Sequence, residues 1–211
     1  MRAPESCSPE RLSPAHRALR EATHAIHARL NRHPLLKGIT RRGYPPEYYV
    51  RVLVAYWHAF RQVDASVANA LGLCHCSFEY SRRLPWLLDD LRALGIDPDA
   101  VGNRPTVRHE PLRLEGQAEL VGALYAIEGS SLGGQVIYAN LARTLRLTTT
   151  SGARFFHGYG EQTSERWRRF GLIMAAELDD ECKRTIAAGG ATAVFNLMER
   201  TLDDYAFRTI G

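Results

Sequence analysis

Two histidines, His24 and His27, lie three residues apart in a stretch that repeats apolar residues at helical spacing. A neutral imidazole is a common metal ligand and a proton carrier near neutral pH. If Leu19, Ile26 and Leu30 mark the buried face, His27 falls roughly 80° from its centre and His24 roughly 140°. We therefore expect His24 in solvent and His27 at the border of the core. From that border His27 is either a half-buried residue or an axial ligand reaching into a cavity between helices.

Polar residues accompany His27 on the same side of this predicted helix. Asn31 follows one turn later, and its side-chain oxygen could accept the second ring N–H, as the neighbour of a metal-bound imidazole must. Arg20 precedes His27, and its guanidinium could pair with an anion near the same cavity. The group would suit a metal complex that carries negative charge.

Three glycines, Gly129, Gly133 and Gly134, interrupt an otherwise strong helix former in the sequence EGSSLGG. Each costs about 0.5–1 kcal/mol relative to alanine inside a helix. Gly129 and Gly133 are four residues apart, so both lie on one side, where no side chain would keep a ligand or neighbour away. The alternatives are close packing of two helices, or a break between two shorter helices.

Other chemical motifs are incomplete or missing from the sequence. It contains no HExxH, no paired Glu-x-x-His, no GxSxG elbow, no phosphate-binding loop and no dinucleotide fingerprint. Cys74 and Cys76 flank His75, but no second pair of ligands follows, so this cluster reads as small apolar residues at a helix end rather than a zinc site.

The elements that must position these residues are predicted to be helices, because the apolar periodicity is helical throughout and no alternating strand is found. Ser13-Pro14 is a helix start, and the first helix should end at the Asn31–Pro34 break. A polar, proline-rich loop is expected from Gly95 to Glu115. The further helices are predicted at Pro46–Gly72, Ser77–Leu94 with a bend or split at Pro85, Gly116–Leu147, Thr163–Ala188 ending at Gly189-Gly190, and Thr192–Arg208.

Composition indicates one all-α domain over residues 1–211, with residues 1–11 flexible. The 211 residues include 45% hydrophobic and 24% charged residues, which is typical of a globular protein. No apolar run is long enough to span a membrane and the start has no signal-peptide core, so we expect a cytoplasmic protein. The formal charge of +4 is dispersed rather than blocked, which favours an anionic ligand or an acidic partner over nucleic acid.

The motifs LREATHAIHARL at Leu19–Leu30 and ALYAIEGSSLGGQVI at Ala123–Ile137 together resemble the haem oxygenases. The latter, followed by FFHGYGEQTSERWRRF at Phe155–Phe170, is most similar to the bacterial branch found alongside bacteriophytochromes. The likeness extends from about Leu12 to Leu202. It implies a single helical domain in which haem, both cofactor and substrate, lies between a proximal helix and a kinked distal helix.

Carried over by position, the resemblance makes His27 the iron ligand and leaves His24 outside the site. Gly129, Ser130 and Gly133 take the catalytic positions on the distal helix, which crowds the oxygen side of the iron. Ser130 stands where the animal enzymes have an aspartate, so a different proton route is implied, through water held by Ser130 or by backbone carbonyls. The implied haem contacts are Arg20, Thr23, His27, Asn31, Gly129, Gly133, Gly134, Arg166 and Arg169, the last two as propionate partners.

The resemblance also implies an activity: haem is oxidised to biliverdin, with release of iron and carbon monoxide. No flavin or nicotinamide motif is present, so the electrons must come from a separate ferredoxin or flavoprotein reductase, and the basic surface favours an acidic donor. Biliverdin could supply a bacteriophytochrome, or iron release could be the purpose. The competing hypothesis is a haem carrier or sensor on the same fold, suggested by the missing distal aspartate.

Overall fold

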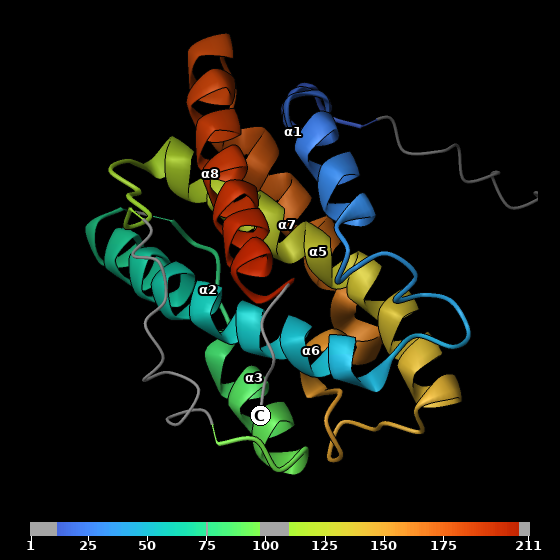
Figure 1. Cartoon of the computed structure of the whole chain (residues 1–211). Coiled ribbons are helices and arrows are strands. Elements are labelled where there is room, and N and C mark those ends of the chain that lie inside the picture. The colour runs from blue at the N-terminus through green and yellow to red at the C-terminus, as the bar shows by residue number, and fades with distance from the viewer. Residues whose placement is uncertain (1–11, 75, 98–109, 207–211) are drawn as a thin grey trace, which may run out of the picture.

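The computed structural model of this chain describes residues 12–74, 76–97 and 110–206, and within these residues it is all-helical (Figure 1). The all-α prediction is thereby confirmed. The predicted flexible segment 1–11 and most of the predicted loop lie outside the described residues. The elements are α1 (Pro14–Arg32), α2 (Pro46–Leu73), α3 (Leu84–Ala93), α5 (Gln117–Thr144), α6 (Arg154–His157), a 3₁₀ turn (Gly160–Gln162), α7 (Thr163–Glu177) and α8 (Glu181–Ala206).

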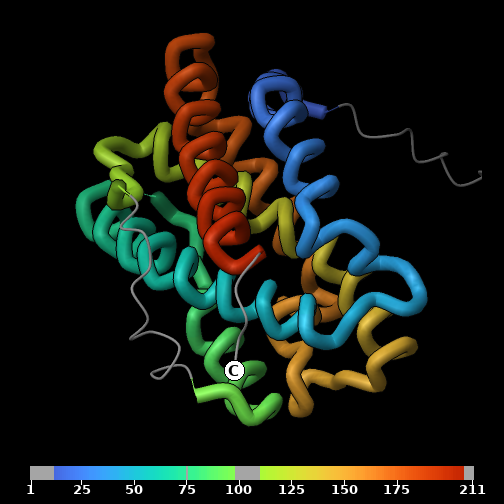
Figure 2. Tube along the Cα trace, in the orientation of Figure 1, coloured from blue at the N-terminus to red at the C-terminus, as the bar shows by residue number. Residues whose placement is uncertain are grey.

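Helix α5 runs through the middle of the molecule and contacts α2, α6, α7 and α8. Helix α8 crosses it and also contacts α1 and α2, while α3 packs on α2 and α6 (Figure 2). The buried apolar residues of these helices form one continuous cluster, which includes Leu19, Leu53, Leu124, Phe170 and Leu197. The core therefore holds α5 from several sides.

The start of α1 is fixed by the predicted cap. The Ser13 hydroxyl accepts a hydrogen bond from the backbone N–H of His16 at 3.2 Å, and Pro14 occupies the first turn. The helix ends at Arg32, within the predicted break. Helix α2 likewise begins at the predicted Pro46 and ends at Leu73, one residue beyond the predicted stop.

The predicted helix over residues 77–94 is wrong in its first part. Residues 77–83 are not helical, and α3 begins only at Leu84, with Pro85 in its first turn rather than at a bend. The carboxylate of Asp64 on α2 accepts backbone N–H groups of Arg83 at 3.2 Å and Leu84 at 2.8 Å. Proline disfavours helix before itself and suits a helix start, so it marks a boundary here.

The predicted stop at Gly189-Gly190 is also wrong, because both glycines lie inside α8. The break comes earlier, between the end of α7 at Glu177 and the start of α8 at Glu181. Asp180 marks that start, since its carboxylate accepts the backbone N–H of Lys183 at 2.8 Å, as an N-cap does.

Glycine instead allows α8 to cross α5 at backbone contact. A Cβ added to Gly190 would lie 2.3 Å from the carbonyl oxygen of Glu119, and one added to Gly122 would lie 1.8 Å from that of Ala187. Both distances are shorter than any real carbon contact, so neither position accepts a side chain without separating the helices.

Candidate functional site

His27 and His24 are both exposed on α1, as was predicted for His24. His27 is more exposed than the predicted border position. The Phe195 ring of α8 packs against it in a T-shaped arrangement, at 6.1 Å between ring centres and 75° between planes. Because His27 is otherwise exposed, its imidazole is available to bind a ligand from outside the core.

Asn31 is the neighbour of His27 that the sequence predicted, but the atoms face differently. The Asn31 Nδ2 lies 3.4 Å from the His27 Nδ1, so in this arrangement the amide donates and Nδ1 accepts. A metal bond through Nε2 requires the proton on Nδ1. Rotating the Asn31 amide by half a turn would present its oxygen and satisfy that tautomer.

Tyr125 on α5 joins this group, although the sequence analysis did not identify it. Burial raises the pKa of the Tyr125 phenol, while a side-chain hydrogen bond with Thr23 and the charge of Arg20 oppose the rise. Thr23 is itself buried. The available signal was spacing, because Tyr125 precedes Gly129 by four residues and therefore shares its side of the helix.

An aromatic cluster surrounds Tyr125. The rings of His16 and Trp167 lie 5.9 Å and 5.8 Å from that of Tyr125, measured between centres, and 5.5 Å from each other. A Cβ added to Gly129 would lie 3.3 Å from Trp167. The cluster therefore joins α1, α5 and α7 immediately beside the first glycine.

The middle of α5 presents a face without large polar groups, which we call the glycine face. It is made of the half-buried Gly129 and the exposed Leu132, Gly133 and Val136. Val136 is 60% exposed and Leu132 36%. A Cβ added to Gly133 would meet no atom within 4 Å. The helix is continuous through these residues, so the alternative of a break between two helices is wrong. Nor does close helix packing account for Gly133.

Two of the remaining predicted residues on α5 have other partners. Gly134 is buried against α6, where an added Cβ would lie 3.0 Å from the Phe156 carbonyl oxygen, so its glycine lets the two helices pack closely and does not lie on the glycine face. Ser130 is exposed, and its hydroxyl donates to the Ile127 carbonyl at 2.7 Å.

The predicted propionate arginines of α7 lie in different surroundings. The Arg166 guanidinium donates to the carbonyl oxygen of Glu79 at 2.6 Å and stacks 4.0 Å from the centre of the Tyr159 ring. These contacts hold the segment before α3, and the propionate role of Arg166 stays a prediction. Arg169 is exposed on α7, and its role stays a prediction.

Helices α1 and α5 are joined at two places. At the first, the ring of His16 on α1 packs against that of Tyr125 on α5, with 5.9 Å between the ring centres. At the second, the Asn140 amide nitrogen donates to the carbonyl oxygens of Ile39 and Arg41 in the loop after α1, at 2.9 Å each. Residue numbers increase from the first junction to the second on both sides, along α1 with the loop after it and along α5.

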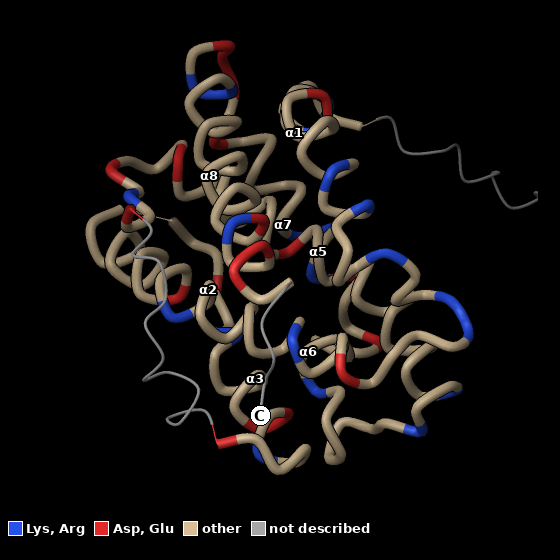
Figure 3. Tube along the Cα trace, viewed as in Figure 1, with Lys and Arg blue, Asp and Glu red and all other residues tan. Residues whose placement is uncertain are grey.

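His27 and Asn31 lie between these junctions on α1, and Gly129 and Gly133 lie between them on α5. The junctions are protein contacts, whereas His27 and Gly133 are exposed. The arrangement can therefore accept a flat apolar ligand between an imidazole and an apolar helix face that has no side chain at Gly129 and Gly133. Lys and Arg residues follow α1 and the loop after it, which favours a ligand with negative charge (Figure 3).

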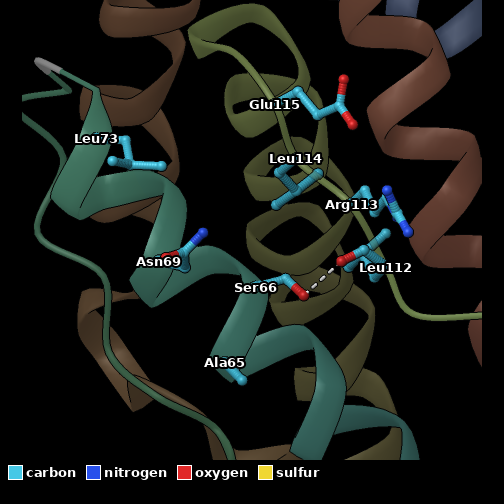
Figure 4. Close-up of a pocket in the computed structure, with 8 residues that line it drawn as sticks. All are labelled: Ala65, Ser66, Asn69, Leu73, Leu112, Arg113, Leu114 and Glu115. Carbon is cyan, nitrogen blue, oxygen red and sulfur yellow. Dashed lines mark hydrogen bonds between the residues drawn. The ribbon is translucent and has the colours of Figure 1, made fainter.

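A cavity elsewhere in the structure lacks such chemistry. It has a volume of about 580 Å³ and lies between α2 and residues 112–115, where the Ser66 hydroxyl donates to the Leu112 carbonyl at 2.7 Å (Figure 4). Its lining contains one arginine and one glutamate, Arg113 and Glu115, but no histidine or cysteine. We do not assign it a role in the chemistry.

Known proteins with similar sequences and structures point to one family. The family model Heme oxygenase matches residues 13–204. A heme oxygenase of Xanthomonas campestris pv. campestris (strain 8004) is 36% identical over 150 residues, which are 70% of this chain and 84% of that protein.

Two solved structures share the fold. The NO- and CO-bound heme oxygenase from Neisseria meningitidis superimposes with a TM-score of 0.71 at 24% identity, covering 92% of each chain. The heme oxygenase from Leptospira interrogans superimposes with a TM-score of 0.70 at 16% identity, covering 88% of this chain and 97% of that one. With the family model matching nearly all of the described helices, this chain belongs to the haem oxygenase family.

Proposed function

We propose that this protein is a haem-degrading monooxygenase, which converts haem to biliverdin and releases iron and carbon monoxide. The observation that carries the proposal is the pairing of an exposed imidazole, His27, with the glycine face of α5 between two fixed junctions. The similarity to a named heme oxygenase at 36% identity supports it.

The residues present fit haem. The imidazole of His27 supplies a nitrogen ligand of the kind that iron accepts. The glycine face offers an apolar surface, with Leu132 and Val136 exposed, for one side of a porphyrin. Arg20 provides a cation for carboxylates at its edge.

Bound haem would supply the iron at which oxygen is activated, and this chain supplies the surroundings. His27 would bind through Nε2 while Asn31 orients the ring through Nδ1. Because Asn31 is an amide rather than a carboxylate, it makes His27 a less basic ligand. Gly129 and Gly133 let the backbone of α5 approach the opposite side, and this crowding would direct oxidation to one edge of the ring.

The proton route is proposed to pass through water held at the glycine face. The Ser130 hydroxyl donates to Ile127, which leaves its lone pairs available to accept a hydrogen bond from water. Exposed backbone at Gly133 offers no side-chain acid of its own. Water is therefore the carrier that fits these groups best.

We propose that electrons come from a separate acidic ferredoxin or flavoprotein reductase in the cytoplasm, attracted by the basic residues along α1 and the loop after it. Within the described residues no helix is both long and apolar enough to cross a membrane. The motif at Phe155–Phe170 favours a bacteriophytochrome as the protein that receives the biliverdin.

A non-catalytic haem carrier or sensor is the second candidate, and one observation favours it: Ser130 stands at the position where an acid would organise water. The two functions predict different absorption spectra for the haem-bound protein. Under reductant and oxygen, a carrier keeps an intact Soret band, whereas an oxygenase loses it as the ring opens.

The test is reconstitution with hemin, addition of reductant and oxygen, and identification of the tetrapyrrole product by chromatography. We expect biliverdin. His27→Ala should remove the nitrogen-ligand features of the haem spectrum, and the matched His24→Ala should keep them. If His24→Ala loses those features while His27→Ala retains them, the ligand assignment is wrong.

A further inference from the structure

The way α5 is held changes at Glu128. Before it, the helix buries large apolar side chains, among them Leu120, Leu124 and Ile127. From Glu128 through Asn140, all of which the structure describes, its buried residues are Glu128, Gly134 and Asn140, and none has a large apolar side chain. Apart from the half-buried Ile137 and Tyr138, which pack against the core, and the close approach of Gly134 to α6, the part of the helix that carries the glycine face is held by polar contacts.

The strongest of these contacts is a buried ion pair. Arg83, just before α3, and Glu128 are only 2% and 3% exposed. The Arg83 Nη2 lies 2.9 Å from the Glu128 Oε1, and Nη1 donates to the Tyr159 hydroxyl oxygen at 2.8 Å. That hydroxyl in turn donates to the same Glu128 oxygen at 3.1 Å. Three side chains from separate parts of the chain thus close a ring of hydrogen bonds.

Arg83 is itself fixed from several directions. Its guanidinium lies 4.6 Å from the Trp86 ring centre and 4.7 Å from that of Tyr159. Its backbone N–H donates to Asp64, and Nη1 donates to the Ser81 carbonyl at 2.8 Å. Because the Arg83 guanidinium is held in one place, Glu128 can pair with it in only one position. A flexible apolar contact would not fix the position of Glu128 in this way.

The polar contacts continue along one side of α5. The Arg83 Nη2 also lies 3.3 Å from the Ser131 hydroxyl, and the Gln135 Nε2 donates to the His157 carbonyl at 2.5 Å. Glu128, Ser131 and Gln135 follow the spacing of one helix face. At about 100° per residue, that face is turned by roughly 110° from the glycine face. Holding one face therefore sets the direction in which the other points.

We infer that Arg83, through Glu128, is a positioning residue that sets the place and orientation of the glycine face opposite His27. This inference rests on the proposed function for its catalytic meaning, and on the contacts of Arg83 and Glu128 for the anchoring itself. Arg83 acts through Glu128 and does not touch the substrate in this account. Loss of the pair should loosen α5 after Glu128 while its apolar first half keeps its packing.

The experiment uses the full chain with Arg83→Met, Arg83→Lys and Glu128→Gln. Hydrogen exchange of the hemin-free protein should show amides of residues 129–134 exchanging at least about tenfold faster in Arg83→Met, because loss of about 1.4 kcal/mol of local stability is one factor of ten. Amides of residues 120–127 should keep parental rates. Arg83→Lys retains the charge without the fork of donors and should lie between.

With hemin bound, kcat for ring opening should fall by about ten- to a hundredfold, as expected when a reacting group is misplaced by an ångström, while hemin affinity changes less than about threefold. The matched control is the exposed pair Glu165 and Arg168 on α7, at 2.8 Å. Glu165→Gln should leave both the exchange of residues 129–134 and kcat unchanged.

Parental exchange at residues 129–134 in folded Arg83→Met would overturn the inference, as would equal acceleration over residues 120–127, which marks a general loss of stability. If Arg83→Met does not fold, Arg83→Lys and Glu128→Gln decide by the same criteria. Failure of the proposed function is distinguishable: the parent protein would then make no biliverdin, while the exchange pattern would still report on the anchor.

Discussion

Gly133→Ala should make the hemin-free protein more stable and the enzyme worse. The added methyl group would meet no atom within 4 Å, so no packing cost offsets its effect on the helix. Alanine is favoured over glycine inside a helix by about 0.8–1 kcal/mol. For a chain of this size, that gain corresponds to a rise in Tm of about 2–4 °C.

The same methyl group stands on the glycine face, where the proposed function puts the oxygen side of haem. We therefore expect weaker hemin binding or slower ring opening, and Gly133→Val should exaggerate the loss. Thermal unfolding by circular dichroism gives the stability, and hemin titration with product chromatography gives the function. The opposite control is Gly122→Ala, whose Cβ would lie 1.8 Å from the Ala187 carbonyl oxygen and should destabilise the fold by several degrees or more.

Two results would refute this reasoning. If Gly133→Ala lowers Tm, the position is not open and some packing contact requires the glycine. If it raises Tm and biliverdin forms at the parental rate, the glycine face does not limit the approach of the substrate, and the assignment of α5 to the oxygen side fails.

Three further predictions follow from other contacts. Gly190→Ala should lower Tm like Gly122→Ala, because its Cβ would lie 2.3 Å from the Glu119 carbonyl oxygen; an unchanged Tm would mean that the helices separate at no cost. Burial raises the pKa of Asp90 to about 6, against N–H bonds from α6 that lower it. Because the folded pKa is above the unfolded one, the stability of the parent relative to Asp90→Asn should fall as pH rises from about 4 to 6, measured by urea unfolding; a relative gain would show that the N–H bonds dominate. Arg20→Glu should weaken hemin affinity by about ten- to a hundredfold in a titration, and an unchanged Kd would remove Arg20 from the site.

The parts of the fold that local sequence could predict are those with local causes. Ser13 and Pro46 mark helix starts through caps and the fixed φ of proline, and both helices begin where expected. The predicted helix end at Gly190 was wrong because glycine occurs both where a helix ends and where two helices touch. The sequence alone does not separate these two cases. Only the partner helix distinguishes them, and it lies some 70 residues earlier in the chain.

The residues of the candidate site also divide into those with a signal in the local sequence and those whose role depends on a distant segment. His27 and Gly133 could be selected by periodicity and by their conformational cost, each within one helix. Tyr125 needed knowledge that α1 and α5 meet. The ion pair between Arg83 and Glu128 had no local signal, because a buried charge becomes exceptional only when its surroundings are known.

The close crossing of α5 and α8 has a consequence for how this sequence can change over generations. Gly122 and Gly190 can be replaced only together with a shift of both helices, so the crossing point is closed to gradual substitution. The second half of α5 exposes Leu132 and Val136, where single changes do not disturb the core. Selection can therefore alter the surface offered to a ligand one residue at a time while the scaffold behind it stays the same.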